Sequence, residues 1–442
     1  MKSIFQLYLI IINLVAMLIT NVNLLLALIF IEIISIVFVF RKQIFNPLNY
    51  ILTYGLLLVV SLYYGINSNF ERSPFFFQEI NDNNLIMMTL TYIIHAIYFL
   101  FIGFSIFKTN KERDINKNSR KLFLKIIFIL FIGFGILNFI YLLLKGINFT
   151  NFNYTSIEIK NKGYTTIGYT LFMPIGIYVY RYYIFLSNKK KKIYCILALS
   201  SFMFKITTGR IYSSLAMMLI LLFIEIYLSK KNNSEKFKIL LKCCLGISIL
   251  GIVIYFLRLY KGYIYAGLST KGIMTNFIEK FSYYSIDKGN IPNSAILLRI
   301  IKEYGITKDF MQGKTFLSIL GNNNYNPEIL IKKTFYLEAP GGNLPTTIFG
   351  EMYMNFGREI SYFYFILLGI FIKFTYNIFL KSQNFFIKIL YIELLLNSYL
   401  LLFKGELALL NNLNIILILL VYISEKFFIK YTKILKNTKS NY

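Results

Sequence analysis

Five arginines stand out because this chain otherwise uses lysine for positive charge. Only nine of its 47 basic residues are arginine. A guanidinium group offers a fixed fork of donors that matches phosphate oxygens in pairs, which an ammonium group does not. Arginines that share one side of the predicted topology therefore indicate a phosphate or diphosphate ligand. The five on that side are Arg72, Arg210, Arg258, Arg299 and Arg358.

Glu351 is the carboxylate best suited to act as a general base, because activation of a hydroxyl needs a positioned carboxylate. A short helix is expected after Pro345, and helical spacing places four polar side chains on one face of it. These are Thr347, Glu351, Asn355 and Arg358, and the opposite face, expected to be buried, carries Ile348, Phe349, Met352 and Phe356. An ordinary ion pair between Glu351 and Arg358 is the competing interpretation. Weaker candidates for the base are Glu303, Glu328 and Glu338.

Three further ionisable residues lie inside apolar runs. His95 is the only histidine, and with no acid in its own run it is better explained as a neutral, hydrogen-bonded core residue than as a functional group. Glu32 and Glu393 are expected to pair with lysines of other runs, such as Lys242 or Lys388. We predict no metal site and no cofactor.

The composition places the chain in a membrane. Of its 442 residues, 57% are hydrophobic, and the mean hydropathy of +0.60 leaves too much apolar surface for a soluble globular protein. The net charge of +27 is spread in short runs between apolar segments, which is typical of topology signals and not of a nucleic-acid-binding face. Cys195, Cys243 and Cys244 lie in apolar runs, without the spacing of a disulfide framework or a metal site.

About twelve apolar runs are long enough to cross the bilayer as helices. They are 4–20, 24–40, 48–65, 85–107, 122–144, 166–186, 193–207, 211–228, 239–257, 359–380, 385–403 and 407–424. The first reads as a retained signal anchor. Basic loops alternate with these runs so that both termini are expected in the cytoplasm. Arg210 follows a tight turn and Arg258 ends a run, so both are expected at the outer membrane boundary. Arginines at the boundary also snorkel to headgroups or pair with acids. For Arg72, which lies beside Glu71, pairing with an acid is the favoured interpretation.

Residues 258–358 form the one long interval without a membrane-length apolar run. The sequence therefore predicts an all-α, polytopic membrane protein with helices in 1–257, a large extracytoplasmic loop at 258–358, and further helices with a basic tail in 359–442. Within the loop, residues 294–305 have the apolar stripe of a surface helix, with Ser294 placed to cap it and Gly305 to end it. Arg299, on the polar side of this helix, and Lys314 join Asn355 and Arg358 as candidates for substrate binding.

Three stretches resemble the O-antigen polymerases, which join oligosaccharide repeat units during assembly of bacterial surface polysaccharides. They are TTGRIYSS at 207–214, FLRLYKG at 256–262, and the order GKTFLSIL, NPEIL, GGNLPTTIFGEMYMNFG between 313 and 357. The resemblance covers the C-terminal half, whereas the first 190 residues match in hydropathy alone. Two departures are that no glycine follows Arg258 at the family's spacing, and that Arg358 directly follows Gly357.

The resemblance implies a GT-C-like, metal-independent, inverting glycosyltransferase of the bacterial inner membrane, acting on undecaprenyl-diphosphate-linked oligosaccharide. Arg210 and Arg258 match the family's loop arginines, and Glu351 lies in its Gly-Glu-x-Tyr-x-Asn-Phe-Gly stretch. A chain-length regulator and a flippase are the expected protein partners, and O-antigen and capsule polymers are both open. The alternatives are a flippase or transporter of lipid-linked oligosaccharide and an O-antigen ligase-like enzyme. The related ligases use a histidine in their large loop, which this loop lacks.

Overall fold

The computed structural model describes most of the chain as helix. The described residues are 2–41, 43–67, 82–115, 121–147, 149, 158–159, 162–187, 192–207, 211–229, 233–265, 273, 291–320, 323–334, 346–399, 402 and 413–439. No strand occurs among them; an isolated bridge joins Tyr304 and Lys308. The all-α prediction is confirmed for this part of the chain.

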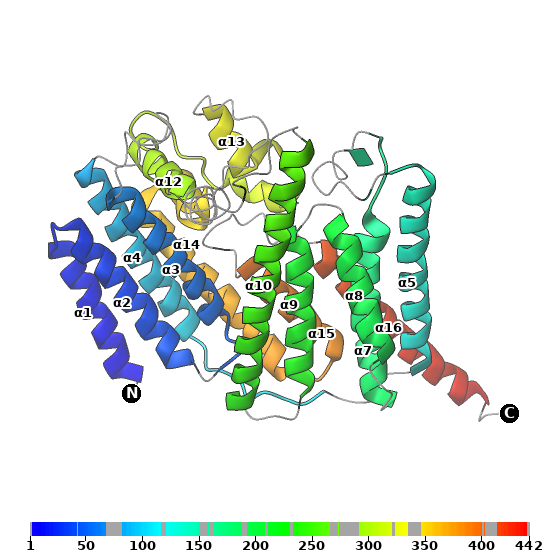
Figure 1. Ribbon diagram of the computed structural model, residues 1–442. Coiled ribbons are helices and arrows are strands. Elements are labelled where there is room, and N and C mark those ends of the chain that lie inside the picture. The colour runs from blue at the N-terminus through cyan, green and yellow to red at the C-terminus, as the bar shows by residue number, and fades with distance from the viewer. Residues whose placement is uncertain are drawn as a thin grey trace. The chain divides into compact units, whose positions relative to one another are not determined.

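Each predicted membrane span contains a helix in its described part (Figure 1). The helices are α1 Lys2–Leu18, α2 Val22–Phe40, α3 Pro47–Asn67, α4 Asn83–Ser105, α5 Lys121–Leu144, η2 Gly168–Phe172 with α7 Met173–Ser187, α8 Lys192–Thr207, α9 Ile211–Leu228, α10 Asn233–Tyr265, α14 Thr347–Lys381, α15 Phe385–Leu394 with η6 Leu395–Tyr399, and α16 Leu413–Lys439. Between α10 and α14 lie α12 Ile291–Glu303, η4 Lys314–Leu320, η5 Asn323–Tyr325 and α13 Pro327–Thr334. Helix thus extends into both ends of the predicted loop.

Four of the described helices are long and apolar enough to cross a membrane: α2, α4, α5 and α14. Shorter apolar helices cover Ile4–Leu18 and Ser214–Leu228. Large apolar side chains are exposed along these helices, such as Leu18 on α1 and Leu137 on α5, and lipid is the solvent that accommodates them. The protein is therefore membrane-embedded, while twelve spans, the side of the termini and the identity of the membrane stay predictions.

The contacts divide the chain into two compact units. Unit 1 contains 1–111, 278–380 and 397–411, and unit 2 contains 112–277, 381–396 and 412–442. Unit 1 thus joins α1–α4 with α12–α14, so the first helices of the chain and residues 278–358 of the predicted loop belong to one unit. The boundaries predicted at 258 and 358 were based on the expected membrane topology, and they do not coincide with the boundaries of these units.

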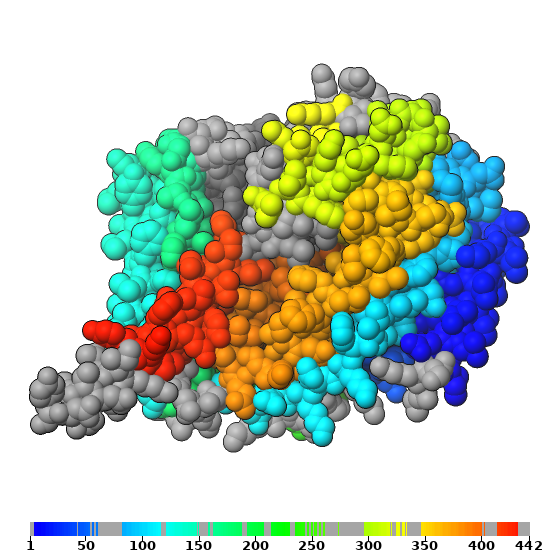
Figure 2. Space-filling view, turned by 180° about the vertical axis from the view of Figure 1, so that it is seen from behind, coloured from blue at the N-terminus to red at the C-terminus, as the bar shows by residue number. Residues whose placement is uncertain are grey.

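Two glycines let α4 and α14 approach closely within unit 1. A Cβ atom on Gly103 would lie 2.0 Å from the carbonyl oxygen of Ile366, and one on Gly369 would lie 2.2 Å from that of Leu100. No side chain fits at such separations. Small residues at helix crossings are a common device for packing membrane helices, and this crossing fixes the spanning part of α14 against α4. The two helices lie side by side in Figure 2, α4 in cyan and α14 in orange.

The helix predicted at 294–305 is present as α12. Its apolar stripe is buried, comprising Ile296, Leu297, Ile300, Ile301 and Tyr304, and it packs against α3 and α4 (Figure 1). Gly305 follows the helix with a φ of +86°, a conformation suited to glycine at a helix end. The predicted cap at Ser294 is wrong, because α12 begins three residues earlier, at Ile291.

Unit 2 is held by close helix packing and by polar contacts between partly buried side chains. In α5, a Cβ atom on Gly135 would lie 2.8 Å from the Cβ of Met173 in α7. Arg181 of α7 forms a two-point ion pair with Glu225 of α9. Glu393 of α15 accepts a hydrogen bond from Asn414 of α16 at 3.4 Å. Whether Glu393 also pairs with a lysine stays a prediction.

Candidate functional site

A break in α14 creates the backbone geometry of the candidate site. Gly357 has φ +71° and ψ −172°, which are not helical angles. In an unbroken helix, the carbonyls of Met354 and Asn355 would accept from the N–H groups four residues later. They instead accept from the N–H groups of Met311 at 3.0 Å and Gln312 at 2.9 Å. The break therefore joins the segment 311–315 to the first part of α14.

Three buried side chains complete this junction. The Thr315 hydroxyl donates to Glu351 Oε1 at 2.8 Å, and Asn355 Nδ2 donates to Thr315 Oγ1 at 2.6 Å and to the Glu351 carbonyl at 2.8 Å. The Gly313 N–H donates to Asn355 Oδ1 at 3.0 Å. We call Thr315, Glu351 and Asn355 the Glu351 cluster. It brings together two of the predicted site residues, Glu351 and Asn355.

All three side chains of the Glu351 cluster have an exposed fraction of 0%. Hydrogen bonds to a charged acceptor contribute about 1.5–3 kcal/mol each, so the contact with Thr315 is a substantial part of what holds this junction. A substrate hydroxyl can reach the Oε1 atom only if the Thr315 hydroxyl moves away from it. The geometry is that of a carboxylate masked by its own hydroxyl partner.

Both faces of the first part of α14 are buried. Ile348, Phe349 and Met352 are buried as predicted, and the Tyr92 hydroxyl of α4 donates to the Phe349 carbonyl at 3.0 Å. Phe356, predicted to be buried, is only partly so. The face with Thr347, Glu351 and Asn355 was expected to be a polar surface, and it is buried instead. The segment 291–334 supplies the cover, as Figure 2 shows in yellow-green and yellow above the gold start of α14.

Arg358 does not share a face with Glu351. The prediction assumed an unbroken helix, whereas the break at Gly357 lies between the two residues. Arg358 Nε donates to the Tyr362 hydroxyl at 3.1 Å and lies 3.9 Å from Glu359 Oε1. The proposed ion pair between Glu351 and Arg358 is therefore wrong, and Arg358 belongs to a separate group of contacts.

His95 is buried and hydrogen-bonded, as the core interpretation predicted. Its exposed fraction is 4%, and its ring nitrogens lie 3.4 Å from the Asn13 carbonyl and 3.4 Å from the Tyr362 hydroxyl. Glu32, expected to pair with a lysine, accepts a hydrogen bond from Asn13 at 3.2 Å instead. The amide satisfies one carboxylate oxygen without bringing a charged side chain between α1 and α2.

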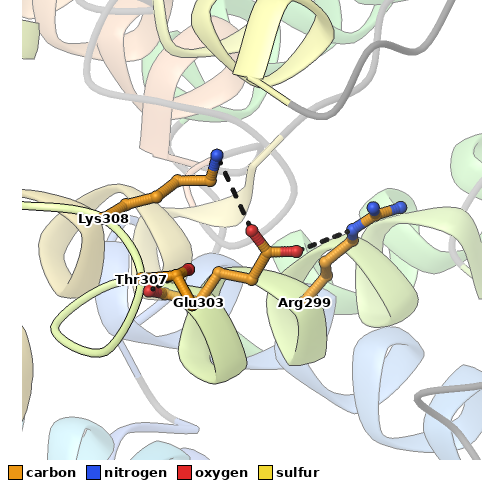
Figure 3. A network of polar contacts seen from close by, with 4 residues as sticks. All are labelled: Arg299, Glu303, Thr307 and Lys308. Carbon is orange, nitrogen blue, oxygen red and sulfur yellow. Dashed lines mark hydrogen bonds and ion pairs between the residues drawn. The ribbon is translucent and has the colours of Figure 1, made fainter.

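Arg299 takes part in a local ion-pair network at the end of α12 (Figure 3). Its Nε lies 3.4 Å from Glu303 Oε1, while Lys308 Nζ lies 3.7 Å from Glu303 Oε2. Thr307 donates to the Glu303 carbonyl at 3.1 Å. These contacts tie the turn after α12 to the helix, so a phosphate ligand at Arg299 would compete with Glu303.

The remaining predicted residues are not brought to the Glu351 cluster by any described contact. The Lys314 side chain is exposed although its backbone lies beside Thr315. Of Arg258 only the backbone is described, as part of α10 in unit 2, and Arg210 lies outside the described residues. Among the described residues, no three His, Cys, Asp or Glu side chains gather as metal ligands would.

No family model, curated protein or solved structure matches this chain.

Two residues of these contacts escaped the sequence analysis. Thr315 directly follows Lys314, and in that stretch the charged residue was preferred although the hydroxyl makes the buried contact. Tyr362 follows Arg358 by four positions, and this helical spacing is a signal that could have identified it.

Proposed function

We propose that the protein is a membrane glycosyltransferase that polymerises undecaprenyl-diphosphate-linked oligosaccharide repeat units into an O-antigen or capsule-type polysaccharide. One observation carries the proposal. The stretches GKTFLSIL and GEMYMNFG, which carry the resemblance to O-antigen polymerases, meet at the Glu351 cluster through Thr315 and Asn355. Two polar motifs that pack on each other around one carboxylate are a reasonable basis for a catalytic site.

In the proposed reaction, a hydroxyl oxygen of one lipid-linked repeat unit attacks the anomeric carbon of the growing glycan. The bond from that carbon to the diphosphate breaks, and undecaprenyl diphosphate leaves with the electron pair. Glu351 accepts the proton of the attacking hydroxyl. A single displacement of this kind inverts the anomeric centre. No other reactant is required.

Arginines would stabilise the negative charge that develops on the departing diphosphate. Arg210 and Arg258 keep this assignment from the sequence analysis. Arg299 would contribute beside Glu303, whose carboxylate lies 3.4 Å from its Nε and offsets part of its charge. We expect Arg258→Lys to be impaired as well as Arg258→Ala, because a lysine lacks the two-point fork.

Burial of Glu351 adds a step before the chemistry. The Thr315 hydroxyl binds Glu351 Oε1 at 2.8 Å, and in the proposed scheme the acceptor hydroxyl replaces it. In this scheme, movement of the segment 311–315 admits the acceptor and protects the carboxylate from water at other times.

The direct experiment is conversion of purified lipid-linked repeat units by the purified full-length protein in liposomes. We expect a ladder of glycolipids that differ by one repeat unit, without nucleotide sugar or added metal. The proposal would be contradicted if the single-repeat glycolipid stayed unchanged although the thermal unfolding profile showed that the protein is folded.

A transporter of lipid-linked oligosaccharide is the second candidate. Ionisable side chains are buried in helices of both units, namely Glu32, Lys373, Lys388 and Glu393, and such groups within membrane segments often mark a transport path. The same liposomes separate the two functions. Movement of the glycolipid between leaflets without a ladder would favour the transporter.

A further inference from the structure

A line of hydrogen bonds connects Arg358 to the middle of unit 1. Arg358 Nε donates to the Tyr362 hydroxyl at 3.1 Å, within α14. That hydroxyl lies 3.4 Å from His95 Nδ1 of α4. His95 Nε2 in turn lies 3.4 Å from the carbonyl oxygen of Asn13 in α1. Three helices thus meet through four residues.

The direction of each hydrogen bond follows from its end points. A carbonyl oxygen can only accept, so His95 Nε2 carries the hydrogen toward Asn13. In a neutral imidazole the other nitrogen is then an acceptor, and the Tyr362 hydroxyl donates to it. The Tyr362 oxygen accepts from Arg358. Every donor in the line faces an acceptor, so the line orients the Arg358 side chain through Nε.

This arrangement leaves the outer end of the guanidinium for a ligand. Neither terminal amino group of Arg358 has a hydrogen-bond partner among the residues that the structure describes. The Arg358 side chain is 35% exposed, and that of Glu359, the nearby acid, is 84% exposed. Solvent screens an ion pair with so exposed a carboxylate, so Arg358 keeps its capacity for an anion.

We propose that Arg358 binds a phosphate or diphosphate group through its two terminal amino groups, and that Tyr362 and His95 are positioning residues that orient its guanidinium. The paired geometry of those amino groups matches two phosphate oxygens. Naming the diphosphate of the polyprenyl carrier as the ligand rests on the proposed function. The proposal that Arg358 binds an anion does not depend on that function.

The packing around Tyr362 allows its hydroxyl to be tested separately from its ring. The ring stacks on Phe99 at 5.0 Å and lies 5.7 Å from the ring of Tyr92. Tyr362→Phe keeps these contacts and removes only the oxygen that accepts from Arg358. His95→Gln keeps one donor and one acceptor, whereas His95→Phe removes both, so this pair separates hydrogen bonding from volume.

The test is calorimetric titration of inorganic pyrophosphate into the full-length protein in phosphatidylcholine nanodiscs, which measures the binding affinity. Arg358→Ala is expected to weaken binding at least tenfold. Tyr362→Phe and His95→Phe should weaken it about two- to tenfold, the range for loss of one hydrogen bond. His95→Gln should bind close to the unaltered protein. A second set of nanodiscs containing phosphatidylglycerol identifies the source, because competition by this lipid would indicate a headgroup site.

Each outcome decides one part. Unchanged pyrophosphate affinity in Arg358→Ala overturns the anion site. Weak binding in Arg358→Ala with full binding in both Tyr362→Phe and His95→Phe overturns the positioning roles. Equal loss in His95→Gln and His95→Phe, with unchanged unfolding profiles, would also contradict positioning by hydrogen bonds. Pyrophosphate binding without any polymerisation of lipid-linked repeat units would leave the anion site in place and reject the proposed function.

Discussion

The Thr315 hydroxyl donates to the Glu351 carboxylate at 2.8 Å, although 36 positions of sequence separate the two residues. Because Thr315 also accepts from Asn355 at 2.6 Å, its hydroxyl both donates and accepts in one buried junction. This relationship sets both the stability of the site and access to Glu351.

Thr315→Val should destabilise the protein by about 1.5–3 kcal/mol, because the buried carboxylate loses a hydrogen-bond donor while the volume is nearly kept. Thermal unfolding in detergent micelles measures the effect. Thr315→Ser retains the hydroxyl and is the matched control. Equal unfolding temperatures for Thr315→Val and the unaltered protein would show that the contact with Glu351 contributes nothing.

Gly357→Ala should release the segment 311–315 from α14. At φ +71° and ψ −172° only glycine is readily accommodated, and an added Cβ would lie 2.8 Å from Phe310 Cζ. Straightening of the helix would withdraw the carbonyls that Met311 and Gln312 bind. Hydrogen exchange at those two amides should accelerate. Unchanged protection there would mean that the break does not depend on Gly357.

Gly369→Ala should separate α4 from α14, because its Cβ would come within 2.2 Å of the Leu100 carbonyl oxygen and the backbone would have to shift. We expect a loss of roughly 1–3 kcal/mol, the usual cost of overpacking. Gly133→Ala in α5 is the control, since nothing lies within 4 Å of the Cβ added there. Similar unfolding profiles for both variants would contradict close packing of the two helices.

Local periodicity predicted the helices well. The stripe that includes Ile296 and Ile300 is buried, Gly305 ends α12 as its conformational freedom suggests, and the described part of each apolar run contains a helix. These features depend on neighbours within a few turns, which a single sequence displays.

The candidate site was predicted less well because its contacts are between distant segments. Helical spacing placed Arg358 beside Glu351, but the break at Gly357 separates them. Helical spacing also predicted that the helix face with Glu351 is exposed, because nothing in the sequence of 347–358 indicates that residues 311–315 pack against it. The pairing of Arg299 with Glu303, four positions later, was accessible to sequence reasoning. Phosphate binding was preferred there because arginine is scarce in this chain.

The central claim is that Glu351 accepts the proton of the acceptor hydroxyl, and Glu351→Gln tests it most directly. Glutamine keeps an oxygen for the Thr315 hydroxyl but cannot serve as the base. In liposomes with lipid-linked repeat units, ladder formation should fall by about 10²–10⁴-fold, with an unchanged unfolding profile. Glu359→Gln, on an 84% exposed side chain of the same helix, should retain activity. Ladder formation by Glu351→Gln at the unaltered rate would contradict the account.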